Sequence, residues 1–132
     1  MSTLDPLTLL ARVQTLSQKS LATITILVLS NLFFNVLANA SFKVSAGSQT
    51  VQGFWIWQIV GNLAGLVTVI TLTFMLRIIP LYVAIPLTMG LTVIGVQIFA
   101  ARMLFDEPVT PIKWAGTLLI LLGILLVGGP KN

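Results

Sequence analysis

The sequence predicts an all-α integral membrane protein, a four-transmembrane-helix bundle preceded by a short N-terminal amphipathic interfacial helix. Composition is the first reason: of 132 residues, 57% are hydrophobic and only 8% are charged, whereas a soluble domain carries about 25% charged residues. The second reason is that four apolar segments are long enough to cross a bilayer core, which needs about 20 helical residues. These segments lie at about residues 21–42, 54–76, 79–104 and 111–129.

Residues 1–20 are expected to form the interfacial segment. Asp5 and Pro6 are typical of a helix start. An apolar side and a cationic side follow at helical spacing, formed by Leu9, Val13 and Leu16 and by Arg12 and Lys19. An alternative is a signal peptide cleaved after Ala38-Asn39-Ala40, but its apolar run is too long and contains amides. We therefore expect the mature chain to keep residue 1 onward.

Residues 21–130 are expected to form one transmembrane domain, because only short connections separate the spans. The connections VSAGSQTVQG, RIIP and FDEPVTP are polar, or contain proline, and are too short for a soluble domain. Thr110 is a plausible N-cap, and Pro111 suits the first position of the last helix. An up-down-up-down order follows. It places Trp55, Trp57 and Trp114 on one side of the membrane, as in an aromatic belt.

The cations give little information on orientation. One side of the membrane would hold Arg12, Lys19, Arg77 and Lys131, and the other Lys43, Arg102 and Lys113. We predict a single topology with cytoplasmic termini, while the near balance also permits an antiparallel dimer. Arg102 and Lys113 flank Asp106 and Glu107 in the last connection, where we expect a weak interfacial charge cluster.

Several functional classes are excluded by composition. The chain has no Cys and no His, which excludes disulfides, thiolate or imidazole metal sites, and Ser-His or Cys-His nucleophile pairs. Seven cations and three acids give a net charge of +4, with no run of cations that could follow a nucleic acid. We predict no enzyme activity, no catalytic residues, no metal, no cofactor and no nucleic-acid partner.

A row of polar residues marks the first span. Asn31, Asn35, Asn39 and Lys43 are spaced four apart, so on a helix they form one stripe about 18 Å long. The amides suit uncharged polar groups, and the cation suits a phosphate. The stripe therefore predicts a groove for a polar headgroup. The alternative is that the amides bond to Gln58 and Asn62 of the second span and only hold helices together.

The glycines and one proline suggest where helices approach one another or bend. Gly61 and Gly65 form a G-x-x-x-G pair, which fits either dimerisation or packing within the chain. Pro86 and Gly90 in the third span predict a kink or hinge that frees a carbonyl.

The second half of the chain resembles the C-terminal half of the drug/metabolite transporter superfamily (EamA-like). The resemblance covers about 50 residues, from an aliphatic-Pro start with Tyr82 to an acidic-Pro-Thr-Pro loop with Trp114 and a glycine-bearing last helix. SFKVSAGS after the first span is similar to the same region of small multidrug resistance proteins. Four spans in a chain of this length are also typical of that half-size group, in which two chains make one transporter.

One difference from small multidrug resistance proteins affects the predicted function. Those proteins bind protons and cationic drugs through a membrane glutamate, and here that position is Asn35. An amide neither titrates nor carries charge. The chain is more similar to the flippase subunits for lipid-linked aminoarabinose, which lack that glutamate and share the Glu107-Pro108-Val109-Thr110-Pro111 type of loop.

The resemblance implies a transporter or flippase that acts as a homodimer or paired half-transporter in the bacterial inner membrane. It would move a polar or amphipathic solute, such as a polyprenyl-phosphate-linked sugar, with membrane lipid as its surroundings. The candidate substrate-binding residues are Asn31, Asn35, Asn39, Lys43, Gln58, Asn62 and Tyr82, and the candidate dimer contacts are Gly116 and Gly123. The alternatives are a multidrug-resistance-like exporter and a non-transporting subunit that scaffolds a glycosyltransferase or another complex.

Overall fold

The protein is mainly helical over its described residues, 5–128 of a computed structural model, with no strand in that range. The elements are α1 (Pro6–Ala46), α2 (Val51–Met75), α3 (Leu81–Gly95), the π-helical η1 (Val96–Leu104) and α4 (Pro111–Gly128). The all-α prediction is confirmed. Lys131, counted in the predicted orientation, and residue 129 of the predicted fourth span lie outside the described residues.

Among residues 5–128, three helices are long and apolar enough to cross a membrane: α1, α2, and α3 continued by η1. The fourth, α4, is apolar but shorter, with 18 residues. At about 1.5 Å per residue it is about 27 Å long, slightly less than a hydrocarbon core of about 30 Å. Pro111 is its first residue, and the Thr110 carbonyl accepts the first helical bond, from Trp114 N at 3.2 Å.

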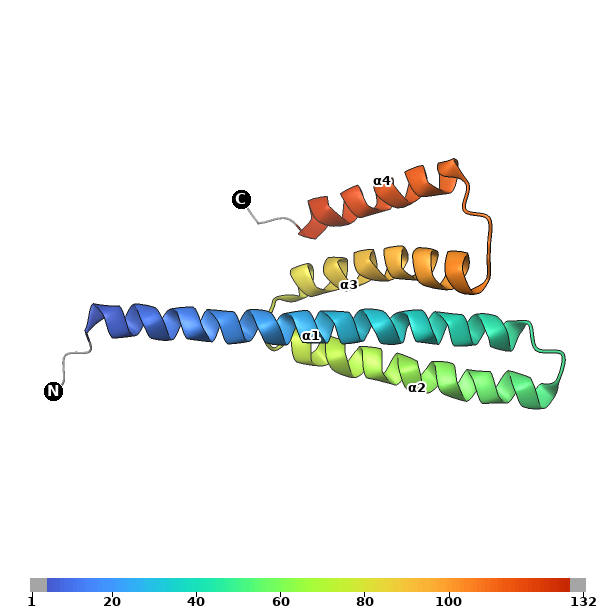
Figure 1. Ribbon diagram of the computed structural model, residues 1–132, viewed down its shortest axis with the longest axis horizontal. Helices are drawn as coiled ribbons and strands as arrows, with labels where there is room; N and C mark the ends of the chain where they lie inside the picture. The colour runs from blue at the N-terminus through green and yellow to red at the C-terminus, as the bar shows by residue number, and fades with distance from the viewer. Residues whose placement is uncertain (1–4, 129–132) are drawn as a thin grey trace.

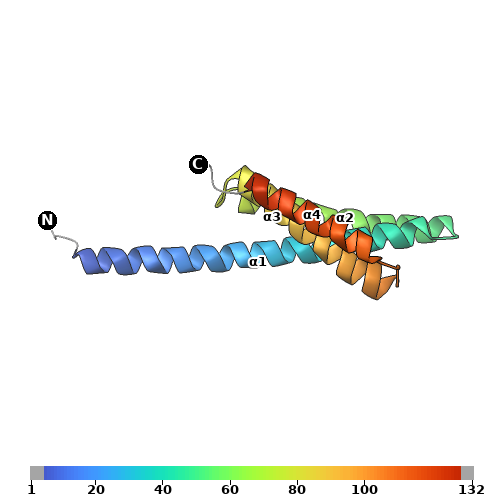
Figure 2. The same ribbon diagram turned by 90° about the horizontal axis from the view of Figure 1, so that it is seen from above.

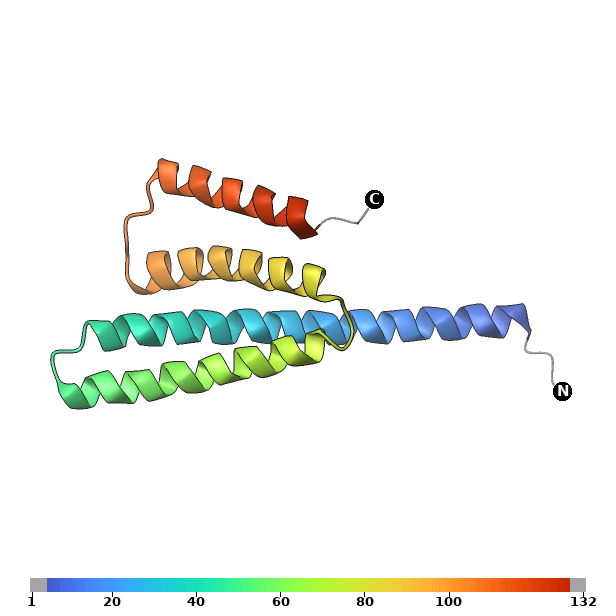
Figure 3. The same ribbon diagram turned by 180° about the vertical axis from the view of Figure 1, so that it is seen from behind.

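The helices form an open row in the order α2, α1, α3, α4, whereas the sequence predicted a four-helix bundle (Figures 1 and 3). Consecutive helices run in opposite directions, as the short connections require. Because α1 lies between α2 and α3, α4 cannot reach α2 to close a bundle and packs on α3 instead. Viewed from above, α3 and α4 cross α1 obliquely (Figure 2).

The N-terminal segment and the first span are one continuous helix, which corrects the prediction of a separate interfacial helix. The predicted start is confirmed: the Asp5 carboxylate accepts a hydrogen bond from Leu7 N, and Pro6 is the first helical residue. No glycine or proline interrupts the 40 residues that follow Pro6, so no helix-breaking residue separates the N-terminal segment from the apolar part of α1. At about 60 Å, α1 is twice the thickness of a bilayer core, and its N-terminal part extends beyond the other helices (Figure 1).

Small residues bring α1 and α2 together. Ala38, Ser41 and Ser45 are buried on one side of α1, at helical spacing, and the Ser45 hydroxyl donates to the Phe54 carbonyl at 2.9 Å. On α2, Gly61 is buried under the ring of Phe42 of α1. Such interfaces are typical of membrane helices, where close packing replaces the hydrophobic effect.

Replacing Gly61 by alanine should therefore destabilise the fold. A Cβ there would lie 2.5 Å from Phe42 Cε1, and overpacking of this kind costs about 1–3 kcal/mol. Thermal unfolding in detergent would measure the loss. Gly65→Ala is the matched control, because a Cβ there meets nothing within 4 Å; equal unfolding temperatures for the two variants would contradict the packing described.

The third span begins as an α-helix and continues as a π-helix after Gly95. Pro86 lies inside α3, and Gly90 is where α4 approaches, with Leu121 Cδ2 3.4 Å from a Cβ built there. At Gly95, the last α-helical residue, a Cβ would lie 2.6 Å from Leu32 Cδ1 of α1. The π-helix η1 begins directly after this close approach. Such helices are rare and are frequently found at functional sites.

Candidate functional site

The amide row on α1 winds around the helix, and its two ends contact different neighbours. Each step of four residues turns the side chain by about 40°, so the row drifts by about a third of a turn from Asn31 to Lys43. Asn31 is buried against α2, where its amide donates to the Thr68 carbonyl at 2.9 Å and to Thr71 Oγ1 at 3.0 Å. Lys43 instead faces the connection between η1 and α4, where it meets Glu107.

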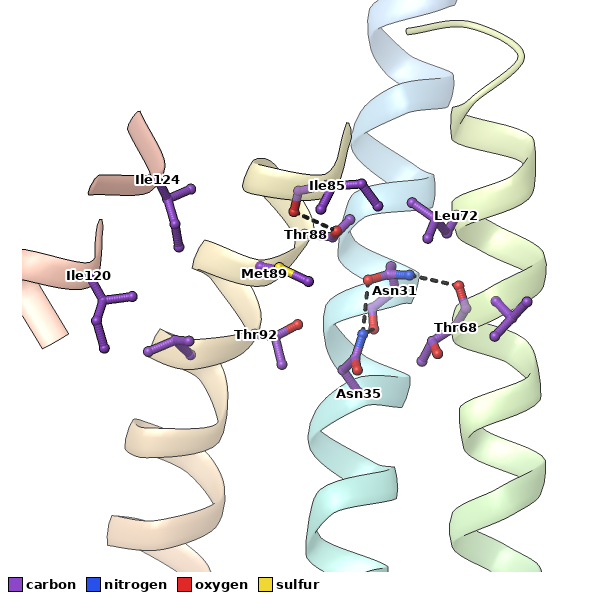
Figure 4. A pocket seen from close by; sticks show the side chains of 12 residues that line it. Asn31, Asn35, Thr68, Leu72, Ile85, Thr88, Met89, Thr92, Ile120 and Ile124 are labelled. Atoms are coloured by element: carbon purple, nitrogen blue, oxygen red, sulfur yellow. Dashed lines mark hydrogen bonds between the residues drawn. The ribbon is translucent and has the colours of Figure 1, made fainter. Parts of the chain in front are cut away.

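A groove of about 440 Å³ opens beside the first half of this row, on the side where α1, α2, α3 and α4 all contribute side chains (Figure 4). Asn31 and Asn35 of α1 lie between residues of α2 on one side and residues of α3 and α4 on the other. No charged residue lines the groove among the residues that the structure describes. Its polar lining residues are Asn31, Asn35, Thr68, Thr88 and Thr92, and its apolar ones are Val69, Leu72, Ile85, Met89, Val93, Ile120 and Ile124.

The groove's threonines were not predicted from the sequence. Thr68 and Thr71 on α2 are three apart, and Thr88 and Thr92 on α3 are four apart, so each pair shares a helix face. Hydroxyl groups repeated at helical spacing inside apolar spans are the signal that could have identified them.

A second, smaller hollow of about 240 Å³ lies beside the far end of the row. Asn39 and Lys43 line it from α1, together with Val96, Ala100, Ala101 and Phe105 and the carboxylate-bearing Glu107. Lys43 Nζ and Glu107 Oε1 form an ion pair at 2.7 Å, with side chains 58% and 45% exposed. An exposed pair contributes at most about 1 kcal/mol, so an incoming charged group could exchange with either partner.

Among the described residues, Glu107 is the one whose side-chain pKa is clearly shifted. The hydrogen bond from Lys43, followed by the charges of Lys43 and Lys113, lowers the pKa of this carboxyl from its ordinary value of 4.5. Because the folded pKa is the lower one, the pair stabilises the fold fully above the ordinary value. That stabilisation is lost as the pH falls through the lowered pKa.

Two other cations near this hollow contact the connection between η1 and α4. In the expected charge cluster, Arg102 of η1 and Asp106 form an ion pair at 3.2 Å. Asp106 has a φ of +47°, in the left-handed region that Asp tolerates better than most residues. Lys113 Nζ donates to the Pro108 carbonyl at 3.3 Å.

Three predicted site residues lie outside both hollows. The Asn62 amide donates to the carbonyl of Gln58 at 2.7 Å and to its Oε1 at 3.3 Å, on the outer side of α2. Tyr82, 45% exposed, is near the start of α3 and lines neither hollow. The interhelix hydrogen bonds foreseen between the amide row and Gln58 or Asn62 are absent from the described residues, and Asn31 reaches Thr68 and Thr71 instead.

The candidate dimer glycines face open space on α4. A Cβ built at Gly116 or at Gly123 meets nothing within 4 Å. Between them, the buried Thr117 hydroxyl contacts Gln97 Oε1 of η1, which ties α4 to the π-helix by a bond that the sequence did not predict. The inner side of α4 is therefore attached, while the two glycines are unobstructed within the chain.

The two hollows suit binding and passage of a solute. The groove has polar atoms to recognise an uncharged group and apolar walls to accept hydrocarbon, and the hollow at the end of the row adds one cation and one anion. No acid lines the groove among the described residues.

Comparison of the chain with known protein families, with curated proteins and with solved structures finds no match.

Proposed function

We propose that the protein is a half-size membrane transporter or flippase that works as a dimer and moves a polar or amphipathic solute along the groove beside Asn35. The observation that supports this most is the groove itself, where uncharged polar side chains line a hollow of about 440 Å³ between apolar helices. A polar side chain that faces lipid without a function is disfavoured, whereas one that lines a path for a solute has a reason to be there.

In this proposal α4 is the fourth span. It is slightly short for a bilayer core, which local thinning of the bilayer or oligomerisation accommodates. Its surface supports a lipid or protein neighbour, because Leu119 is 70% and Leu126 is 84% exposed. The bacterial inner membrane, with both termini cytoplasmic, remains the proposed location.

Transport in liposomes tests the proposal. The purified chain is reconstituted with a labelled polyprenyl-phosphate sugar in one leaflet, and the label that reaches the other leaflet is followed with a membrane-impermeant quencher. Movement above protein-free liposomes, lost with Asn35→Leu, is the expected result. No movement of the polyprenyl-phosphate sugar or of a neutral glycolipid would favour the scaffolding alternative. The part of α1 that extends beyond the other helices would then be the surface for a partner (Figure 1).

The Lys43–Glu107 pair predicts opposite effects for its two members. Lys43→Gln removes the one cation among the described residues that line the small hollow, and it should weaken binding of an anionic headgroup. Glu107→Gln frees Lys43 from its partner at 2.7 Å and should strengthen that binding. Since exposed pairs are weak, each change should be about two- to fivefold.

Competition by soluble alkyl phosphate measures both variants of this pair, with a neutral glycoside as the control ligand. Anion binding that falls in both variants would show that the pair holds the connection in place and does not exchange with the solute.

A further inference from the structure

The two amides of the groove have no free hydrogens. A side-chain amide carries two N–H bonds and one carbonyl oxygen. Asn31 uses both N–H bonds on α2, to the Thr68 carbonyl and Thr71 Oγ1. Asn35 uses both on the preceding turn, to the Asn31 carbonyl at 3.1 Å and to Asn31 Oδ1 at 3.0 Å (Figure 4).

The orientation of both amides follows from their partners. A main-chain carbonyl can only accept, so the atom facing the Thr68 carbonyl, or the Asn31 carbonyl, must be the nitrogen of each amide. Asn31 Oδ1 is then occupied by the Asn35 amide. Asn35 Oδ1 accepts from none of the described residues and stays available to the groove.

Two of the groove's threonines also use their hydroxyl hydrogens within the protein. The Thr68 hydroxyl donates to the Gly65 carbonyl at 2.7 Å, and the Thr88 hydroxyl to the Ala84 carbonyl at 2.9 Å. A hydroxyl has one hydrogen but two acceptor lone pairs. Each of these oxygens can therefore accept a hydrogen bond and has no hydrogen to give. Thr92 alone has a hydroxyl that engages no other described residue.

We infer that the groove recognises its ligand through hydrogen-bond acceptors and so takes an uncharged group that carries several donors, such as the hydroxyls of a sugar or polyol. The inference rests on the proposed function, in that the solute occupies this groove. An anion would meet acceptor oxygens with almost no donor to bind it. A cation would meet no carboxylate among the described lining residues, and burial of an unpaired charge is costly.

The charges of a ligand would then be read elsewhere. Lys43 and Glu107 line the separate hollow at the other end of the amide row. A phosphate-linked solute would place its hydroxyl-bearing part beside Asn35 and its phosphate toward Lys43. Hydroxyl recognition and charge recognition are thus separable by mutation.

Photo-crosslinking tests the inference on the full chain in lipid nanodiscs. The probes are alkyl glucosides with a diazirine in the alkyl chain, one with free hydroxyls, one with every hydroxyl methylated, and one with an ammonium headgroup. Methylation keeps the oxygen acceptors and removes every donor. Loss of the donors should weaken saturable labelling of the groove segments by about tenfold or more, the effect of one or two lost hydrogen bonds.

Three variants locate the recognition. Asn35→Leu and Thr88→Val each remove an acceptor and should weaken the free glucoside while leaving the methylated probe unchanged. Thr88→Val nearly preserves volume, so it provides a test if Asn35→Leu fails to fold. Asn62→Leu removes an amide outside both hollows and should change neither probe.

Equal labelling by the free and methylated glucosides would overturn the inference, as would tighter binding of the ammonium probe. The proposed function fails by a different result: donor-selective labelling in the groove, without movement of any headgroup across liposomes, would leave the inference standing and exclude transport. Equal transport of the free and the methylated glucoside would support the proposed function and contradict the inference about hydroxyl recognition.

Discussion

Replacing Asn35 by leucine should abolish transport of a polar headgroup in a protein that remains folded. In the structure Asn35 bonds only within its own helix, to the carbonyl and side chain of Asn31. Its loss therefore removes no side-chain hydrogen bond between described helices. In the groove, however, a headgroup donor would meet hydrocarbon near the middle of the membrane, at a cost of several kcal/mol for each unpaired group. We expect the transport rate to fall about 100-fold, the effect of about 2.7 kcal/mol.

Asn31→Leu is the contrasting variant. Asn31 is buried and bonds to α2 through Thr68 and Thr71, so its replacement should lower stability by about 1 kcal/mol. Transport per folded molecule should fall much less than in Asn35→Leu. Thermal unfolding in detergent and initial rates in proteoliposomes separate the two effects. A folded Asn35→Leu dimer with full turnover would show that the amide row only packs helices.

The elements of this fold were predictable because their signals are local. Apolar length identified the spans, and the start of α1 at Asp5 and Pro6 and of α4 at Pro111 depends on residues adjacent in the sequence. The continuity of α1 was missed because a cationic amphipathic pattern was taken as a separate element. Absence of any helix-breaking residue between Pro6 and Ala46 was the stronger signal.

Partners of the amide row were harder to predict, although part of the answer was in the chain. The bonds from Asn31 to Thr68 and from Ser45 to Phe54 are centred on the same point of the connection at residues 47–50. Counting outward from the turn would have placed Asn31 beside Thr68. Gln58 and Asn62 lie nearer the turn, at the wrong depth for Asn31.

The Lys43–Glu107 pair could not have been found in this way. It depends on α3 packing against the face of α1 opposite α2, which brings the connection after η1 to the end of the amide row. Local spacing placed Arg102 close to Asp106 in the expected charge cluster, where the two form an ion pair. It contained no information on which distant cation Glu107 would meet, because the order of helices in the row is set by packing of the whole chain.

Replacing both Gly116 and Gly123 by leucine should convert the proposed dimer into monomers. These glycines lie seven apart on one face of α4, the helix at the outer edge of the row (Figure 1). Close contact between two such helices requires small residues, because membrane helices associate by packing and not by the hydrophobic effect. Larger side chains would hold the facing backbones apart. Crosslinking in mild detergent and in liposomes would measure the dimer fraction.

In this structure the effect of the two replacements on the dimer can be separated from an effect on the fold of the single chain. A Cβ at either position meets nothing within 4 Å in the single chain, so a disturbance of the monomer should be small. Gly65→Leu on α2, where a Cβ also meets nothing within 4 Å, is the matched control and should leave the dimer intact. An unchanged dimer fraction in the double variant would place the interface on another helix. Loss of the dimer in both variants would point to a general effect of bulk in the membrane. Monomers in the double variant alone, with an unchanged unfolding temperature, would assign the dimer contact to α4, because a Cβ at either glycine meets nothing within 4 Å in the single chain.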